Sequence, residues 1–490
     1  MTAQELSLDR LFSRPYLWGT WPSQIAWARK AHRLGFLWNA QSGAVRDLYV
    51  YNADSKKLAR VTDLAGLKDA INDSEAEQDV HRKLYLQPLT GMTAFDLSND
   101  GTKAVFSYRG DLFLASVESG ELQRLTKTKA PELDPRFNSD ASRIACVASG
   151  QLFVMTIGGL IEQKTDIKMP AVLSGFRWSP DGKYLSFSVQ VKPERSVTLP
   201  IYSGQFVTAA PFPRSVAGDQ PSESQLFVIE SSGDSAERVL ETGIMHTARP
   251  PEWAPDSKKL LVVGQSSDYK NQELRVVDIA TARSSVVFRQ KDDRWVEVAN
   301  AGWSPDSSRL WFTSDQSGFQ HLYVINQDGS GKRQITKGNW EVHNDIFSHS
   351  PQWIGNFIYY SSTQKSTAVR QLYRAAVDGD AAEEKLSNRE GVNVGWVTEM
   401  AASALLEADS KNPLDLYVDG ERVTKSPLPE FYQLKWAETK YVSYPSLKDR
   451  KPVAGRLLLP PGYKPDDAGQ TPRPAVVYIH GSGYATSVLK

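Results

Sequence analysis

The sequence has a single cysteine, Cys146, among its 490 residues. One thiol cannot form a disulfide within the chain, so the fold must rest on its hydrophobic core. Cys146 stands in an apolar stretch, Arg143-Ile-Ala-Cys-Val-Ala, where a small buried side chain is its simplest role. We therefore expect neither a disulfide framework nor a cysteine nucleophile.

The chain also lacks an excess of charge, because 57 lysines and arginines balance 57 aspartates and glutamates. This balance gives no reason to expect nucleic acid or a membrane as a partner. No run of about 18 apolar residues is present, so no transmembrane helix is predicted. The first residues lack the basic start and apolar run of a secretory signal. We expect a cytoplasmic protein, or a periplasmic or secreted one if a signal has been removed.

Metal-binding spacing is missing as well. The seven histidines show no His-x-x-x-His pattern, and we predict no metal site and no cofactor.

What the sequence does contain is a repeat. An apolar tetrad recurs at spacings from 40 residues (111 to 151) to 74 residues (151 to 225). A period of about 40 to 50 residues with strand-like units is typical of propeller blades. The tetrads are Asp47-Leu-Tyr-Val, Asp111-Leu-Phe-Leu, Gln151-Leu-Phe-Val, Gln225-Leu-Phe-Val, Glu273-Leu-Arg-Val, His321-Leu-Tyr-Val, Gln371-Leu-Tyr-Arg and Asp415-Leu-Tyr-Val.

A turn motif precedes most of the tetrads by about one hairpin. An aromatic or apolar residue ends a strand, and an Asp with Gly or Ser closes the turn. Because these aspartates recur with the repeat, they are better explained as turn caps than as metal ligands. The motif reads Leu97-Ser-Asn-Asp-Gly, Phe137-Asn-Ser-Asp, Trp178-Ser-Pro-Asp-Gly, Trp253-Ala-Pro-Asp-Ser and Trp303-Ser-Pro-Asp-Ser.

Each repeat thus reads as four short strands whose faces can be buried only against neighbouring repeats. We predict a mainly β fold with an eight-bladed β-propeller over residues 33–427, preceded by an N-terminal segment, 1–32. Two long intervals hold insertions, at 67–83 and 190–222. Long loops of this kind either wall a pocket or are surface excursions.

A different pattern follows residue 427. Two strand-like segments, Lys440-Tyr-Val-Ser-Tyr and Val453-Ala-Gly-Arg-Leu-Leu-Leu, precede Pro474-Ala-Val-Val-Tyr-Ile. The last run is almost continuously apolar, which predicts a strand buried on both faces of an α/β sheet. A glycine-containing loop, His480-Gly-Ser-Gly-Tyr, comes next.

Val476-Val-Tyr-Ile-His-Gly-Ser-Gly-Tyr resembles the strand and loop that open the α/β-hydrolase domain of the prolyl oligopeptidase superfamily, family S9 of the serine peptidases. One subfamily of this superfamily, the dipeptidyl-peptidase IV-like peptidases, is similar to the chain in two further strings. These are Thr313-Ser-Asp-Gln-Ser-Gly-Phe-Gln-His-Leu-Tyr-Val and Trp178-Ser-Pro-Asp-Gly. The resemblance covers residues from about 33 to 490 and implies that 428–490 is the incomplete start of the hydrolase domain.

The resemblance implies a serine-type exopeptidase acting on short peptides, of dipeptidyl-peptidase or acylaminoacyl-peptidase type. Its serine, aspartate and histidine are expected beyond Lys490, because no Gly-x-Ser-x-Gly is present. We therefore expect the 490 residues alone to be inactive. His480, Gly481 and Ser482 are the candidates for the oxyanion hole.

Substrate recognition is less well defined. The subfamily holds the substrate amine with paired glutamates, but this chain has a lone Glu162 at that place. Glu162 and Arg214 are the candidates for substrate binding, and an ion pair is an equal explanation for Arg214. The pair Glu383-Glu384 reads as solvated charges in a blade turn.

Two other functions stay open. The first is a non-catalytic propeller that binds a peptide or protein partner. The second is a propeller glycosidase or lyase, which Val476 to Tyr484 fits poorly. For the peptidase we expect a short peptide as substrate and a homodimer of the full-length protein.

Overall fold

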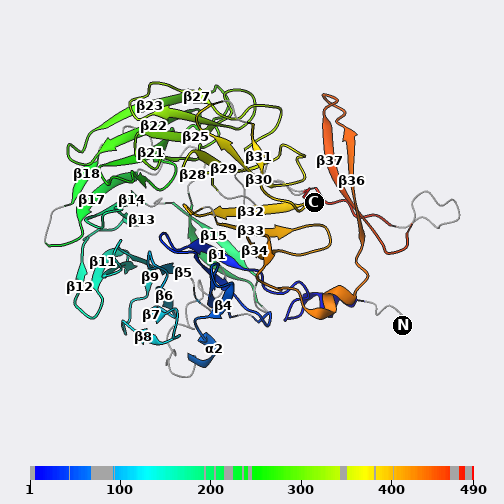
Figure 1. Ribbon diagram of the computed structural model, residues 1–490, viewed down its shortest axis with the longest axis horizontal. Coiled ribbons are helices and arrows are strands. Elements are labelled where there is room, and N and C mark those ends of the chain that lie inside the picture. The colour runs from blue at the N-terminus through cyan, green and yellow to red at the C-terminus, as the bar shows by residue number, and fades with distance from the viewer. Residues whose placement is uncertain are drawn as a thin grey trace.

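The computed structural model describes residues 6–43, 45–67, 92, 94–191, 195–202, 206–214, 224–233, 237–240, 246–342, 350–379, 382–400, 402–463, 474–479 and 488–489. The strands form eight antiparallel sheets, the blades of a propeller, arranged around a common centre (Figure 1). Each blade has its strands in sequence order, apart from an inserted hairpin in blade 4.

The first four blades contain the following strands. Blade 1 consists of β1 (Ser23–Trp27), β2 (Arg33–Trp38), β3 (Asp47–Asn52) and β4 (Lys57–Arg60). Blade 2 consists of β5 (Ala94–Leu97), β6 (Lys103–Tyr108), β7 (Asp111–Ser116) and β8 (Leu122–Arg124). Blade 3 consists of β9 (Glu132–Phe137), β10 (Arg143–Ala148), β11 (Gln151–Thr156) and β12 (Ile161–Gln163). Blade 4 consists of β13 (Ala171–Trp178), β14 (Tyr184–Val191), β17 (Ser224–Glu230) and β18 (Arg238–Leu240).

The remaining blades complete the ring. Blade 5 has a divided first strand, β19 (His246–Thr247) and β20 (Glu252–Trp253), then β21 (Lys259–Gln265), β22 (Asn271–Asp278) and β23 (Ser284–Lys291). Blade 6 consists of β24 (Ala301–Trp303), β25 (Arg309–Ser314), β26 (His321–Asn326) and β27 (Arg333–Gln334). Blade 7 consists of β28 (Gln352–Ile354), β29 (Phe357–Ser362), β30 (Gln371–Ala376) and β31 (Glu384–Lys385). Blade 8 consists of β32 (Val392–Val397), β33 (Ser403–Ala408), β34 (Asp415–Val418) and β35 (Glu421–Arg422).

The sequence repeat and the blades coincide. All eight tetrads lie on the third strands of their blades, and the turn motifs join first strands to second strands. The predicted eight-bladed propeller is therefore confirmed. The propeller starts earlier than predicted, because β1 begins at Ser23, ten residues before the predicted boundary at 33. The strand Ser23-Gln-Ile-Ala-Trp has only Ile25 fully buried, so it carries little of the apolar pattern that marks the other strands.

The hydrophobic core is divided among the junctions between blades. Each of its eight clusters draws residues from two neighbouring blades, and together they cover every junction in the ring. Cys146 is fully buried in the cluster between blades 2 and 3. Burial raises the pKa of its thiol to about 12, as expected for a packing residue rather than a nucleophile.

Blade 8 closes the ring against blade 1 by side-chain packing and hydrogen bonds, since each blade keeps its own strands. Phe36 and Trp38 of blade 1 pack in one cluster with Leu406 of blade 8. The indole nitrogen of Trp27 donates to the carbonyl of Trp396 at 3.1 Å.

Several elements lie outside the blades. They are the helices α1 (Leu8–Phe12) and α2 (Leu64–Leu67), the 3-10 helix η3 (Pro429–Gln433), the hairpin β15 (Ser196–Ile201) and β16 (Thr208–Pro213), and the hairpin β36 (Glu438–Pro445) and β37 (Pro452–Leu459). The hairpin β36–β37 stands apart from the ring (Figure 1). Within the described part of the chain, no helix is long and apolar enough to span a membrane.

The expected buried strand at 474–479 is wrong for this structure. These residues have no strand assignment, and Val476 is 97% and Ile479 86% exposed. An apolar run becomes a buried strand only where neighbouring strands supply hydrogen bonds and cover. Here β36 and β37 pair only with each other. The predicted helical or irregular piece at 67–83 lies outside the described residues, apart from Leu67 at the end of α2.

Candidate functional site

The wall of the central channel is made by the first strands of the blades. First strands of neighbouring blades contact one another, as β5 with β9 and β24 with β28 do. Three of them, β1, β9 and β13, contain a bulge where the pairing register shifts. At each bulge a residue has positive φ, namely Gln24 (51°), Asp134 (49°) and Gly175 (157°). Bulges change the direction of nearby side chains, and they are common beside functional sites.

Equivalent positions in consecutive blades carry charged side chains. The indole of Trp178 donates to the carbonyl of Arg136 at 3.1 Å, and that of Trp303 to the carbonyl of Glu252 at 3.0 Å. In the same way Trp253 bonds to Arg177. These bonds place Arg136, Arg177 and Glu252 at the same position of blades 3, 4 and 5. Asp96 precedes Leu97 in blade 2 as Arg136 precedes Phe137.

We call Asp96, Arg136, Arg177 and Glu252 the charged arc. Desolvation raises the pKa of the Asp96 carboxyl, although Arg136 and a bond from the Phe137 N–H (2.8 Å) oppose the shift. Desolvation likewise raises the pKa of Glu252, opposed by the charge of Arg177. The Glu252 residue nevertheless has solvent-exposed surface. A side chain on the wall of a narrow channel is expected to combine the two properties, because it contacts water while protein on all sides limits its solvation.

A pocket of about 390 Å³ opens beside this arc, between blades 4 and 5. Phe176 and Phe187 line it, although they are only 4% and 1% exposed and pack in the cluster between blades 3 and 4. Arg177 and Arg249 also line it, together with Asp134 of blade 3. Several serines, Gln190 and Thr247 supply further polar groups to its lining.

The two arginines of the pocket are held differently. The Nε of Arg249 donates to the carbonyl of Ala299 at 2.8 Å, and burial lowers the pKa of this guanidinium. Arg177 is exposed, and in the described part of the chain its side chain makes no hydrogen bond or salt bridge, although its charge acts on the Glu252 carboxyl. The arrangement offers a fixed cation and an available one to a single ligand.

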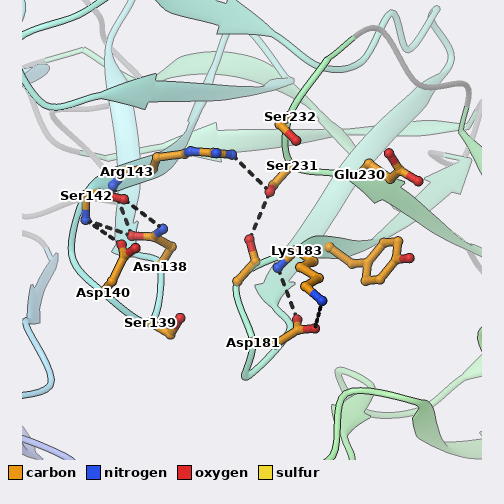
Figure 2. Close-up of a pocket in the computed structure, with 12 residues that line it drawn as sticks. Asn138, Ser139, Asp140, Ser142, Arg143, Asp181, Lys183, Glu230, Ser231 and Ser232 are labelled. Atoms are coloured by element: carbon orange, nitrogen blue, oxygen red, sulfur yellow. Dashed lines mark hydrogen bonds and ion pairs between the residues drawn. The ribbon is translucent and has the colours of Figure 1, made fainter.

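A second pocket, of about 370 Å³, lies at the opposite end of blades 3 and 4 (Figure 2). It is lined by the turns that join β9 to β10 and β13 to β14. Its polar groups are largely satisfied within the protein. Arg143 donates to the Ser231 hydroxyl at 3.1 Å, and Ser231 donates to the carbonyl of Gly182 at 2.9 Å. We interpret it as a solvent-facing groove between turns.

Neither of the predicted substrate-binding residues lines the pocket between blades 4 and 5. Glu162 lies on β12, the outermost strand of blade 3, with its carboxylate 3.7 Å from the Lys164 ammonium. Arg214 is exposed just after β16, and its N–H donates to the carbonyl of Arg195 at 3.0 Å. Their roles in binding stay predictions. His480, Gly481 and Ser482 lie outside the described residues.

Sequence reasoning missed the charged arc and the pocket. A signal was present, because each arc residue directly precedes the residue that opens a turn motif. Reading that position across the repeats gives Asp, Arg, Arg and Glu in succession. Elsewhere in the described residues, no group of three or more His, Cys, Asp or Glu side chains is arranged to hold a metal ion.

Comparison with known families supports the same architecture. Residues 171–415 match the model of the dipeptidyl peptidase IV (DPP IV) N-terminal region. A probable dipeptidyl peptidase 4 of Aspergillus fumigatus is 25% identical over 309 residues, which is 55% of this chain and 39% of that protein. A dipeptidyl peptidase 4 of Trichophyton equinum is 22% identical over 324 residues, 58% of this chain and 40% of that protein. The matched part therefore spans well under half the length of these relatives.

Solved structures show the same fold. The dipeptidyl peptidase 4 of Porphyromonas gingivalis superposes with a TM-score of 0.72 at 14% identity, covering 95% of this chain and 68% of that one. A putative dipeptidyl aminopeptidase IV of Bacteroides ovatus gives a TM-score of 0.63 at 13% identity, covering 91% and 66%.

Proposed function

The chain belongs to the family of the dipeptidyl peptidase IV N-terminal region, and from this premise we propose that it is the propeller of a serine-type exopeptidase. In this proposal the enzyme hydrolyses short peptides, and the propeller binds and orients them. The nucleophilic serine and its partners belong to the hydrolase part of such an enzyme. The propeller's own contribution is the channel wall with its charged arc and pocket.

One observation carries this function, namely that the pocket opens at the end of the ring where the chain leaves blade 8 for η3 and the hairpin β36–β37. Gln190 and Ser224 of the pocket flank the connection between the second and third strands of blade 4. In blade 1, the corresponding connection includes Ser42, whose hydroxyl donates to the carbonyl of Ser426 at 3.2 Å. Ser426 begins the link to η3 and β36. A peptide in the pocket would therefore face the domain that begins with this hairpin.

The direct test uses the native gene product from its source cells. We expect a fluorophosphonate, which labels activated serines, to modify it, and we expect release of dipeptides from short peptides with a free amino terminus. A product cleaving only N-acetylated peptides would support the acylaminoacyl type instead. Intact mass shows how much chain accompanies these 490 residues.

A binding module is the second candidate. The observation in its favour is that the described residues lining the pocket all belong to the propeller, and none of them comes from after blade 8. A native product that binds short peptides, resists the fluorophosphonate and cleaves neither peptide series would establish this function and reject the peptidase.

A further inference from the structure

We propose that the pocket between blades 4 and 5 binds a carboxylate group of a short peptide, with Arg177 as its principal ligand. The proposal rests on the proposed function and names the chemical group that the propeller selects. The carboxylate can be a peptide's C-terminus or an acidic side chain, and the experiment below separates these two sources.

Arg177 differs from its equivalent in blade 3, Arg136, in having no internal carboxylate partner among the described residues. Arg136 is neutralised within its own strand, because its Nε and Nη2 donate to the Asp134 carboxylate at 3.0 and 2.7 Å. Asp134 stands two residues before Arg136, at the bulge of β9. In β13 the position two residues before Arg177 is Gly175, also at a bulge. Blade 4 therefore keeps the cation of blade 3 and lacks its internal carboxylate.

The glycine in place of an aspartate leaves open space beside Arg177. A Cβ built on Gly175 would meet no heavy atom within 4 Å, so the bulge faces an open volume. Gly175 and Arg177 both line the pocket. The place where Asp134 supplies a carboxylate to Arg136 is thus vacant beside Arg177. An external carboxylate can take it and accept two hydrogen bonds from the planar guanidinium.

Arg249 and Thr247 add further polar groups to the pocket. Arg249 is anchored on carbonyl oxygens, with Nε donating to Ala299 and Nη2 to Val298 (3.4 Å), and it forms no salt bridge with a described carboxylate. The Thr247 hydroxyl oxygen, also on the lining, is buried without a hydrogen-bond partner. A buried unpaired hydroxyl is costly, and a ligand oxygen would satisfy it.

The carboxylates around the pocket disfavour a doubly charged ligand. The charge of Asp134 is already paired with Arg136, whereas Glu252 and Glu297 lie near enough to act electrostatically with Arg177 and Arg249, respectively. Like charges nearby disfavour a doubly charged anion more than a carboxylate. A short peptide therefore fits better than a phosphate.

The test measures peptide binding to the 490-residue chain by calorimetry. The probes are tetra-alanine with a free C-terminus, its C-terminal amide, and Ala-Ala-Glu-Ala-amide. We expect one of the two carboxylate probes to bind about tenfold more tightly than tetra-alanine amide, as a charged hydrogen bond would give. The probe that gains affinity identifies the source of the carboxylate. Equal affinity for all three would overturn the proposal.

Two variants decide whether Arg177 is the ligand. In Arg177→Gln the preference for a carboxylate should disappear, whereas Arg294→Gln, at a residue 94% exposed in its side chain, should keep it. Arg177 bonds to blade 5 only through its backbone carbonyl, so the fold should survive its replacement. A preference that persists in Arg177→Gln overturns the assignment. If the chain binds none of the probes, both this inference and its peptide-selecting role fail. Binding without preference defeats the inference alone.

Discussion

At the scale of single residues, a hydroxyl side chain after the fourth strand stabilises most blades. Thr336 is fully buried, and its oxygen accepts from the Leu322 N–H at 3.0 Å and contacts the His321 ring nitrogen at 3.0 Å. The same bond to the leucine of the tetrad recurs from Thr62, Thr126, Thr165, Ser387 and Thr424. These bonds explain why the first residue of most tetrads is polar. Its side chain bonds either to this hydroxyl or to a backbone N–H close to it.

Thr336→Val should destabilise the protein by about 1–3 kcal/mol, because it leaves a buried N–H without an acceptor while keeping the side-chain volume. Urea unfolding at neutral pH measures the loss. Thr208→Val on the exposed hairpin strand β16 is the matched control and should change stability by less than about 0.5 kcal/mol. Equal effects of the two substitutions would show that the hydroxyl bond contributes little.

The turn aspartates make stability depend on pH. Hydrogen bonds from the Ser304 hydroxyl (2.5 Å) and the Ser308 N–H (3.1 Å) lower the pKa of Asp306 to about 2. A carboxyl whose folded-state pKa is lowered stabilises the fold above its unfolded value of 3.8, and this contribution is lost as the pH falls towards about 2. The contribution of Asp306 to the stability of the fold is therefore predicted to change with pH between these two values.

Asp306→Asn should cost about 1 kcal/mol at pH 7, after allowance for solvent screening of an exposed carboxylate. Urea midpoints of the variant and the parent should converge as the pH is lowered from about 4 to 2. Asp293→Asn, at an exposed residue with no hydrogen bond to a described neighbour, should shift the midpoint little at any pH. A difference at Asp306 that stays constant through this range would contradict the prediction.

At the scale of elements, tryptophans join neighbouring blades. Trp303 is 7% exposed, and its indole N–H reaches the Glu252 carbonyl of the preceding blade. Trp303→Phe should destabilise the protein by about 1–2 kcal/mol, since it removes this bond and part of a buried ring. Trp295→Phe is the control, because that indole bonds to Glu297 within its own loop and is 37% exposed. Thermal unfolding should separate the two variants, and a smaller loss at Trp303 than at Trp295 would refute the role.

The blades could be predicted from the sequence because their tetrads and turns are local signals. Asp-Leu-Tyr-Val at 47 and 415 needs only alternation and burial to be read as a strand. The bulge at Gly175 and the pocket beside it could not be predicted from the sequence. They depend on how β13 pairs with β14 and on the approach of blade 5. The prediction of a buried strand at 476–479 failed for the same reason, because an apolar run does not indicate which strands lie beside it. The partner of Arg136 was readable two residues away, but its importance appeared only when blades 3 and 4 were compared in register.

At the scale of the whole molecule, stability is shared among the junctions between blades. A ring of such units depends on its last junction, because an open array would expose the faces of two blades. Blades 8 and 1 are joined by one hydrophobic cluster and by bonds that converge on Ser426, from the Trp38 indole (3.2 Å) and the Ser42 hydroxyl (3.2 Å). Gly19 packs against the same residue. The closing junction is therefore where a small change should affect the whole ring.

Gly19→Ala should open this junction. Gly19 has φ of +73°, and a Cβ there would lie 1.6 Å from the Ser426 carbonyl oxygen, so the backbone that closes the ring must move. Gly233→Ala is the matched control, because its φ is +72° but a Cβ would meet nothing within 4 Å, leaving only a backbone cost of about 1 kcal/mol. We expect Gly19→Ala to cost several times more, and hydrogen exchange to increase in blades 1 and 8 before the others. Equal losses in the two variants, with exchange unchanged at the junction, would mean that the ring does not depend on its closure.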